Sequence, residues 1–144
     1  THVCEVEVDP ETGTVELLNY VVVDDVGTEI NPLTLQGQVV GGIVQGLGQV
    51  LMEQIVYDAE GQLLTASFMD YAMPRAGDIC DFKVGHNAVP TQLNPLGAKG
   101  AGEAGPVGAL AATMNAIVDA LGTANIEMPA TPERVWRALK RLPR

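Results

Sequence analysis

Residues 31–51, with the sequence NPLTLQGQVVGGIVQGLGQVL, form the stretch from which we predict the fold. Apolar side chains recur at helical spacing between Val39 and Leu51, which predicts a long amphipathic helix. Asn31 offers a side-chain cap for its first turn, and Pro32 suits the first helical position. The other elements are placed around this helix.

The sequence on either side of this helix predicts strands and two further helices. Residues 3–8 and 14–24 flank turn residues and are typical of a hairpin; residues 54–57 and 62–66 predict a second one. Residues 69–78 should be irregular, and residues 80–85 suit another strand. A helix is expected from Pro106 to Leu121, where Gly122 ends it.

A short last helix is predicted from about Thr131 to Leu142, with Val135, Trp136 and Leu139 on its buried side. Strands and helices do not alternate regularly along the chain. We therefore predict an α+β fold, in which two main helices and the short C-terminal helix pack on a mostly antiparallel sheet.

Composition narrows the function classes. The 144 residues suit one compact unit, and 47% hydrophobic with 18% charged residues argues against disorder. A formal net charge of −10 would repel nucleic acid and acidic membranes. The most apolar stretch, residues 39–57, is interrupted by polar side chains, which disfavours membrane insertion.

Cys4 and Cys80 lack the spacing of a zinc site or a disulfide framework, so we expect free thiols in a reducing, cytoplasmic setting. The first residues have neither the charged nor the apolar region of a signal peptide. The chain opens directly on strand-like alternation without Met, which suggests a fragment, a trimmed chain or one piece of a split subunit. His2 and His86 stand outside any catalytic constellation, so we expect them to be structural or exposed.

The long helix contains an unusual number of glycines. Each interior Gly costs roughly 1 kcal/mol of helix stability relative to Ala. The absence of a side chain at these positions must therefore serve a purpose. Helical spacing places Gln38, Gly42, Gln45 and Gln49 on one face. This face could pack closely on another element with its glutamines in water. Alternatively, a polar cofactor could approach the start of the helix and hydrogen-bond with Gln38.

A second glycine-rich stretch, NPLGAKGAGEAG at residues 94–105, precedes the second main helix. Glycines allow close approach of a ligand, and the helix start presents free amides to an anion. The stretch lacks the GK[ST] ending of a P-loop, which disfavours a nucleotide-phosphate binder. Two roles are open for Glu103. It could simply stabilise the helix start, or it could stand exposed and ionised in a cleft as a general base.

Four segments together resemble the molybdenum-binding large subunits of the xanthine dehydrogenase, aldehyde oxidoreductase and carbon monoxide dehydrogenase family. Residues 37–48 are similar to that family's GQ-x-x-G-x-x-x-QG-x-G helix, and residues 70–74 to its DY-x-x-P segment. Residues 94–105 resemble its NPLGAKG-x-GE-x-G loop, and residues 129–136 its C-terminal ending. The order of the four motifs is also that of the family.

The resemblance implies a role for each candidate site residue. Glu103 would be the catalytic base beside molybdenum, deprotonating the water or hydroxide whose oxygen enters the product. Gln38 would hydrogen-bond the pterin, and the backbone of Lys99, Gly100, Ala101 and Gly102 would lie against it. Gln45 is a weaker candidate for cofactor binding. No protein ligand to the metal is expected, because the pterin dithiolene holds molybdenum.

The resemblance also implies the cofactors and partners. The cofactor would be molybdopterin cytosine dinucleotide with molybdenum, shared with the remainder of the molybdenum subunit; FAD and [2Fe-2S] would sit on partner chains or domains. The substrate would be an aldehyde, an N-heterocycle or a similar small molecule. Family subunits are several times longer, so residues 1–144 should be the C-terminal portion of the molybdopterin-binding domain and inactive alone. The alternative is a noncatalytic assembly module of a larger oxidoreductase complex.

Overall fold

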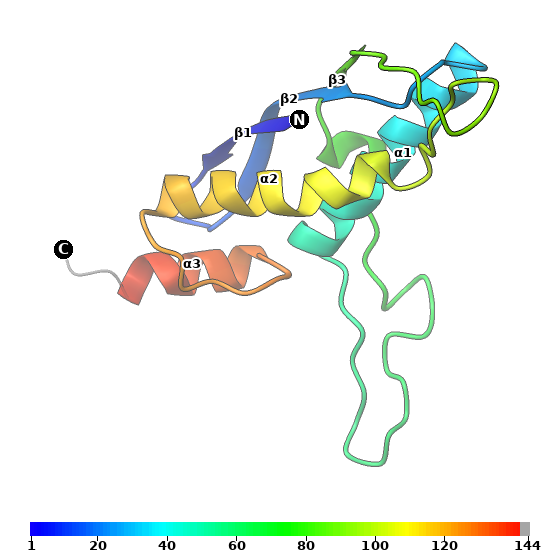
Figure 1. Cartoon of the computed structure of the whole chain (residues 1–144). Coiled ribbons are helices and arrows are strands. Elements are labelled where there is room, and N and C mark those ends of the chain that lie inside the picture. The colour runs from blue at the N-terminus through cyan, green and yellow to red at the C-terminus, as the bar shows by residue number, and fades with distance from the viewer. Residues whose placement is uncertain (142–144) are drawn as a thin grey trace.

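The computed structural model describes residues 1–141 and has the predicted α+β architecture (Figure 1). Its helices and strands are β1 (His2–Val8), β2 (Val15–Asp24), α1 (Pro32–Leu51), the short 3-10 helix η1 (Ala76–Asp78), β3 (Phe82–His86), α2 (Ala104–Leu121) and α3 (Pro132–Arg141). Asn31 caps α1 as predicted, its side-chain oxygen accepting from the Thr34 N–H at 3.2 Å.

The sheet has the order β1-β2-β3 and is mixed. β1 and β2 pair antiparallel as the predicted hairpin, whereas β3 pairs parallel to β2, with Tyr20 opposite Phe82. The expected mostly antiparallel sheet is thus corrected at β3. The physical reason is the connection: α1 and a long loop separate β2 from β3, and a crossover of this length lets the chain return in the same direction.

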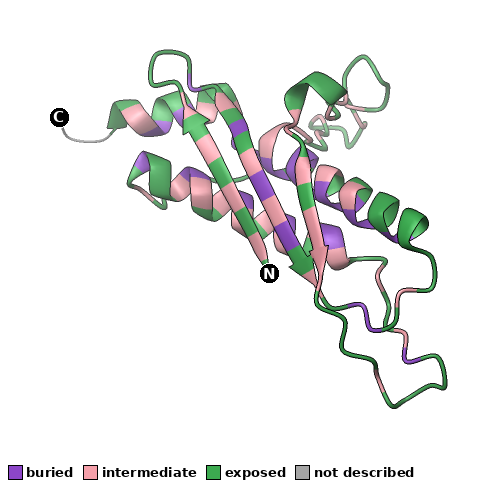
Figure 2. Cartoon of the chain, turned by 90° about the horizontal axis from the view of Figure 1, so that it is seen from above, coloured by how far each residue is buried: buried purple, intermediate pink, exposed green. Residues whose placement is uncertain are grey.

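The core lies between the sheet and the helices. Figure 2 shows α1 and α2 behind the strands, on one face of the sheet. One cluster joins β2 to α1 through Tyr20, Val39 and Ile43, all fully buried. A second cluster, which includes Ile117 and Val135, holds α3 against the ends of α1 and α2. The start of α1 and the loop before α2 meet at this core, where Leu35 is buried and Ala101 packs against the first cluster.

The second predicted hairpin does not form strands. Residues 52–75 instead make a long arm that projects from the body of the molecule (Figure 1), with one isolated bridge between Tyr57 and Leu63. An isolated two-stranded ribbon is marginal in water. Because the arm projects away from the sheet, no third strand among residues 1–141 supports it, and Phe68 and Met69 on its returning segment are 88% and 96% exposed.

The last two helices differ slightly from prediction. α2 begins two residues early, at Ala104, and ends as predicted at Leu121, where Gly122 is the C-cap with a φ of 66°. On α3, Trp136 is 40% exposed with Lys140 Nζ over its ring, and Ala138 takes the buried position expected for Trp136, three residues after Val135. The predicted end at Leu142 falls outside the described residues.

By length and composition α2 could cross a membrane, and it is the one helix in residues 1–141 that could. In the structure it packs against α1 and β1. These contacts account for part of its apolar surface, so its composition is weak evidence for a membrane.

Candidate functional site

The glycine-rich loop before α2 is held together by Asn94. The side-chain oxygen of Asn94 accepts from the N–H groups of Leu96 (3.1 Å) and Ala98 (3.3 Å), and its amide donates to the Ala98 carbonyl (2.9 Å). The Thr28 N–H donates to the Gly97 carbonyl at 3.0 Å, joining the loop to the chain that follows β2. The loop therefore has a defined conformation on the body of the fold.

This junction requires glycine on both sides. Gly27 and Gly97 have φ angles of 65° and 68°, in the left-handed region that favours glycine. A Cβ on Gly27 would also lie 2.3 Å from the Gly97 carbonyl oxygen. The two glycines thus let the chains approach closely enough for the bridge between Gly27 and Ala98.

Lys99 anchors the loop through an ion pair. Its Nζ lies 2.6 Å from Oδ2 of Asp25, and its backbone N–H donates to the Val26 carbonyl at 2.9 Å. The hydrogen bond from Lys99, followed by those from the N–H groups of Gly27 and Val89, lowers the pKa of Asp25 to about 2. The ammonium of Lys99 is therefore engaged within the chain, and Lys99 can face a cofactor mainly through its backbone.

The next residues of the loop offer unpaired backbone donors. Cβ atoms added at Gly100 and Gly102 would meet nothing within 4 Å. Among residues 1–141, the N–H groups of Gly100, Ala101 and Gly102 donate to no acceptor. Exposed amides beside open space can hydrogen-bond a polar or anionic ligand at close range.

α1 contacts this loop at Gln38. The Nε2 of Gln38 donates to the Gly102 carbonyl at 3.1 Å, one residue before Glu103. The contact depends on glycines where the helices meet: a Cβ on Gly105 would lie 2.4 Å from the Val39 carbonyl oxygen, and one on Gly42 would lie 2.6 Å from Cδ of Pro106. The close-packing interpretation thus holds for Gly42, while the amide of Gln38 reaches the loop.

Glu103 occupies the N-cap position of α2. Its side chain is exposed and makes no capping hydrogen bond to the first turn of the helix. Within residues 1–141 no capping contact supports a purely structural role for this carboxylate. It stands beside the open amides of the loop.

A hollow of about 350 Å³ lies between the start of α1 and the loop. Gln38, Lys99 and Ala101 line it together with Asn31 and Thr34 of the α1 start. Gly100 lines a neighbouring hollow with Asp24 and Asp25. Gln45 is exposed and lies about 10 Å further along α1, since seven residues rise about 1.5 Å each.

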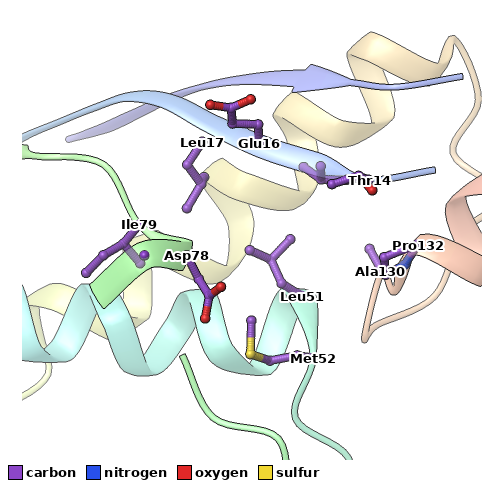
Figure 3. Close-up of a pocket in the computed structure, with 11 residues that line it drawn as sticks. Thr14, Glu16, Leu17, Leu51, Met52, Asp78, Ile79, Ala130 and Pro132 are labelled. Carbon is purple, nitrogen blue, oxygen red and sulfur yellow. The ribbon is translucent and has the colours of Figure 1, made fainter. Parts of the chain in front are cut away.

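A separate pocket lies at the far end of α1 (Figure 3). Leu17 of β2, Leu51 and Met52 at the end of α1, Ile79 and Ala130 contribute to its wall. Leu51 is 13 residues from Gln38, which is about 20 Å of helix. None of the predicted site residues lines this pocket.

Comparison with protein families matches residues 1–80 to the molybdopterin cofactor-binding domain. The nicotine 6-hydroxylase large subunit of Paenarthrobacter nicotinovorans is 44% identical over 96% of this chain and 17% of its own. The carbon monoxide dehydrogenase large chain of Hydrogenophaga pseudoflava is 36% identical over 96% of this chain and 18% of its own. The structure of quinoline 2-oxidoreductase from Pseudomonas putida 86 is 40% identical, with a TM-score of 0.89 over 96% of this chain and 18% of that one.

These matches establish that the chain belongs to the molybdopterin cofactor-binding domain family. The chain spans less than a fifth of the length of these relatives. Its matched part therefore corresponds to a limited region of a molybdenum hydroxylase large subunit.

Proposed function

We propose that this chain forms one wall of the cofactor site in a molybdenum hydroxylase, with Glu103 as the base at the molybdenum centre. The observation that carries the proposal is the 3.1 Å hydrogen bond from Gln38 to the Gly102 carbonyl, which brings the amide of α1 to the loop beside Glu103. These elements are 64 residues apart in the sequence. Family membership supports the chemistry assigned to them.

The residues present fit a pterin cofactor. The amides of Gly100, Ala101 and Gly102 are unpaired among the described residues, and the space beside both glycines is open. Gln38 keeps its amide oxygen for a further hydrogen bond. Backbone amides near a helix start favour phosphate groups, which the pterin cofactor carries. The form that we propose is the cytosine dinucleotide, as the resemblance to bacterial family members implies. When bound, the molybdenum–pterin group supplies the two-electron oxidation chemistry.

Glu103 has the exposure that a base needs. Its carboxylate makes no capping contact, so an oxygen can accept the proton of the water that supplies the product oxygen. The substrate class we propose is an aldehyde, an N-heterocycle or a similar small molecule. Relatives named for nicotine and quinoline, both N-heterocycles, support that class.

We also propose that FAD and [2Fe-2S] reside on partner chains or domains. The names of the relatives support a multi-chain enzyme: one is a large subunit, another a large chain, and a third is subunit gamma of a dehydrogenase complex. Cys4 and Cys80 are both free thiols, which supports the proposed cytoplasmic location.

Replacing Gln38 tests the cofactor wall. We expect Gln38→Ala, made in the enzyme that contains this chain, to weaken cofactor retention about five- to tenfold, because a hydrogen bond contributes about 1 kcal/mol. Gln49→Ala is the matched control, since Gln49 is an exposed glutamine of the same helix outside the hollow. The measurement is molybdenum and pterin per subunit after extended dialysis. Equal retention in both variants would contradict the role of Gln38.

A further inference from the structure

His2 is buried against the start of α2. Its side chain is 7% exposed, and its Nε2 lies 3.2 Å from the carbonyl oxygen of Ala104, the residue that follows Glu103. β1 and α2 thus meet directly beside the proposed base, although His2 and Ala104 are 102 residues apart in the sequence.

Two hydrogen bonds define which ring nitrogen carries the proton. A carbonyl can only accept, so Nε2 of His2 must donate to Ala104. Nδ1 then accepts from the hydroxyl of Tyr20, at 2.8 Å. Burial lowers the pKa of His2, although the Asp24 carboxylate, 3.6 Å from Nε2, acts in the opposite direction. Because burial is the larger effect, the pKa is lowered overall, which favours the uncharged ring with its proton on Nε2.

The ring also has a space shaped for it. A Cβ on Gly108 would lie 2.3 Å from Cδ2 of His2, so only glycine leaves room for the imidazole. Gly108 follows Ala104 by four residues and shares its face of α2. On the other side, fully buried Tyr20 meets the imidazole edge to face, with ring centroids 5.8 Å apart. The imidazole is therefore wedged between the sheet and the first turn of α2.

We propose that His2 is a positioning residue whose Nε2–H holds the Ala104 carbonyl and thereby orients Glu103. The inference rests on the proposed role of Glu103 as the base. The ion pair of Lys99 with Asp25 fixes the beginning of the same short loop, and His2 fixes its end. Between these anchors, Gln38 donates to the Gly102 carbonyl, and the carbonyls of Ala101 and Glu103 accept from the N–H groups of Ala104 and Val107.

Two substitutions at His2 separate positioning from packing. The amide of Gln can reach the place of Nε2 and donate to Ala104, whereas the shorter Asn cannot. In the enzyme that contains this chain, we expect His2→Asn to lower kcat per bound molybdenum about tenfold with KM nearly unchanged, because a small misplacement of a reacting group has a large effect. His2→Gln should recover most of that loss.

A second readout does not depend on turnover. Hydrogen exchange of peptides spanning residues 99–108 should be faster in His2→Asn and return toward the unsubstituted rate in His2→Gln, with or without bound cofactor. If His2→Asn does not accumulate as folded enzyme, Tyr20→Phe serves instead. It keeps the buried ring, removes the hydroxyl that fixes the imidazole, and should lower kcat in the same direction by a smaller factor.

The double variant with Glu103→Gln distinguishes the two proposals. If His2 acts through Glu103, the double variant is no slower than Glu103→Gln alone. If the kcat losses of the two single variants multiply in the double variant, the positioning role is overturned. It is also overturned if both His2 variants lower the unfolding midpoint equally and leave kcat per molybdenum unchanged. If Glu103→Gln alone retains full turnover, the proposed base is wrong and the role of His2 falls with it. An inactive Glu103→Gln beside a fully active His2→Asn overturns the role of His2 only.

Discussion

Glu103→Gln should lower the turnover of the enzyme that contains this chain by roughly 10²- to 10⁴-fold, the range that a general base contributes. The amide has nearly the shape of the carboxylate but cannot accept the proton. Because the side chain is exposed and makes no capping hydrogen bond, the fold should tolerate the change. The measurements are kcat per bound molybdenum and the composition of the assembly.

Glu133→Gln is the matched control for this substitution. Glu133 is an exposed carboxylate in the first turn of α3, and within residues 1–141 it pairs only with Arg137, four residues later on the same helix. It should leave turnover unchanged. Full turnover in Glu103→Gln, with the complex intact, would exclude Glu103 as the base and favour the noncatalytic assembly module.

Gly105→Ala should destabilise the chain, although Ala is normally preferred to Gly in a helix by roughly 1 kcal/mol. The added Cβ would lie 2.4 Å from the Val39 carbonyl oxygen and 2.7 Å from the Ile43 nitrogen, and these backbone atoms cannot move without separating α1 from α2. Overpacking of this kind costs about 1–3 kcal/mol. Thermal unfolding followed by circular dichroism should show a lower midpoint.

Gly41→Ala is the matched control in the partner helix. A Cβ at Gly41 would meet nothing within 4 Å, so only the helix propensity should change and the unfolding midpoint should rise or stay constant. If Gly105→Ala were as stable as Gly41→Ala, the close approach of the two helices would not be needed for the fold. The close approach of α1 and α2 at Gly105 would then not explain the contact of Gln38 with Gly102.

Local patterns predicted the helices well. α1 combines regular apolar spacing with an N-cap at Asn31, and Gly122 is the C-cap of α2. Residues next to each helix therefore indicate where it begins or ends. The direction of β3 could not be predicted in the same way, because its pairing depends on how α1 and the arm return the chain. Likewise, the segments around Tyr57 and Leu63 were predicted to form a hairpin but project where no third strand of the described part of the chain supports them.

Some residues of the candidate site could be predicted from a local motif, and others could not. Lys99 and Glu103 lie within one contiguous motif, which is why the sequence alone could single them out. Asp25 lies 74 residues from Lys99, and nothing in its local sequence marks it as the partner of that ammonium. His2 was expected to be structural or exposed, because it stands outside any catalytic constellation in the sequence. Its neighbours Tyr20 and Ala104 come together only in the folded chain, so the sequence could not indicate these contacts.

Elemental and pterin analysis of the native assembly, purified through a tag on this chain, would test the proposed molybdenum site most directly. We predict molybdenum and a pterin cytosine dinucleotide in near-equal amounts, copurifying with flavin and iron–sulfur components. A homogeneous, intact assembly that contains neither molybdenum nor pterin would contradict the proposal.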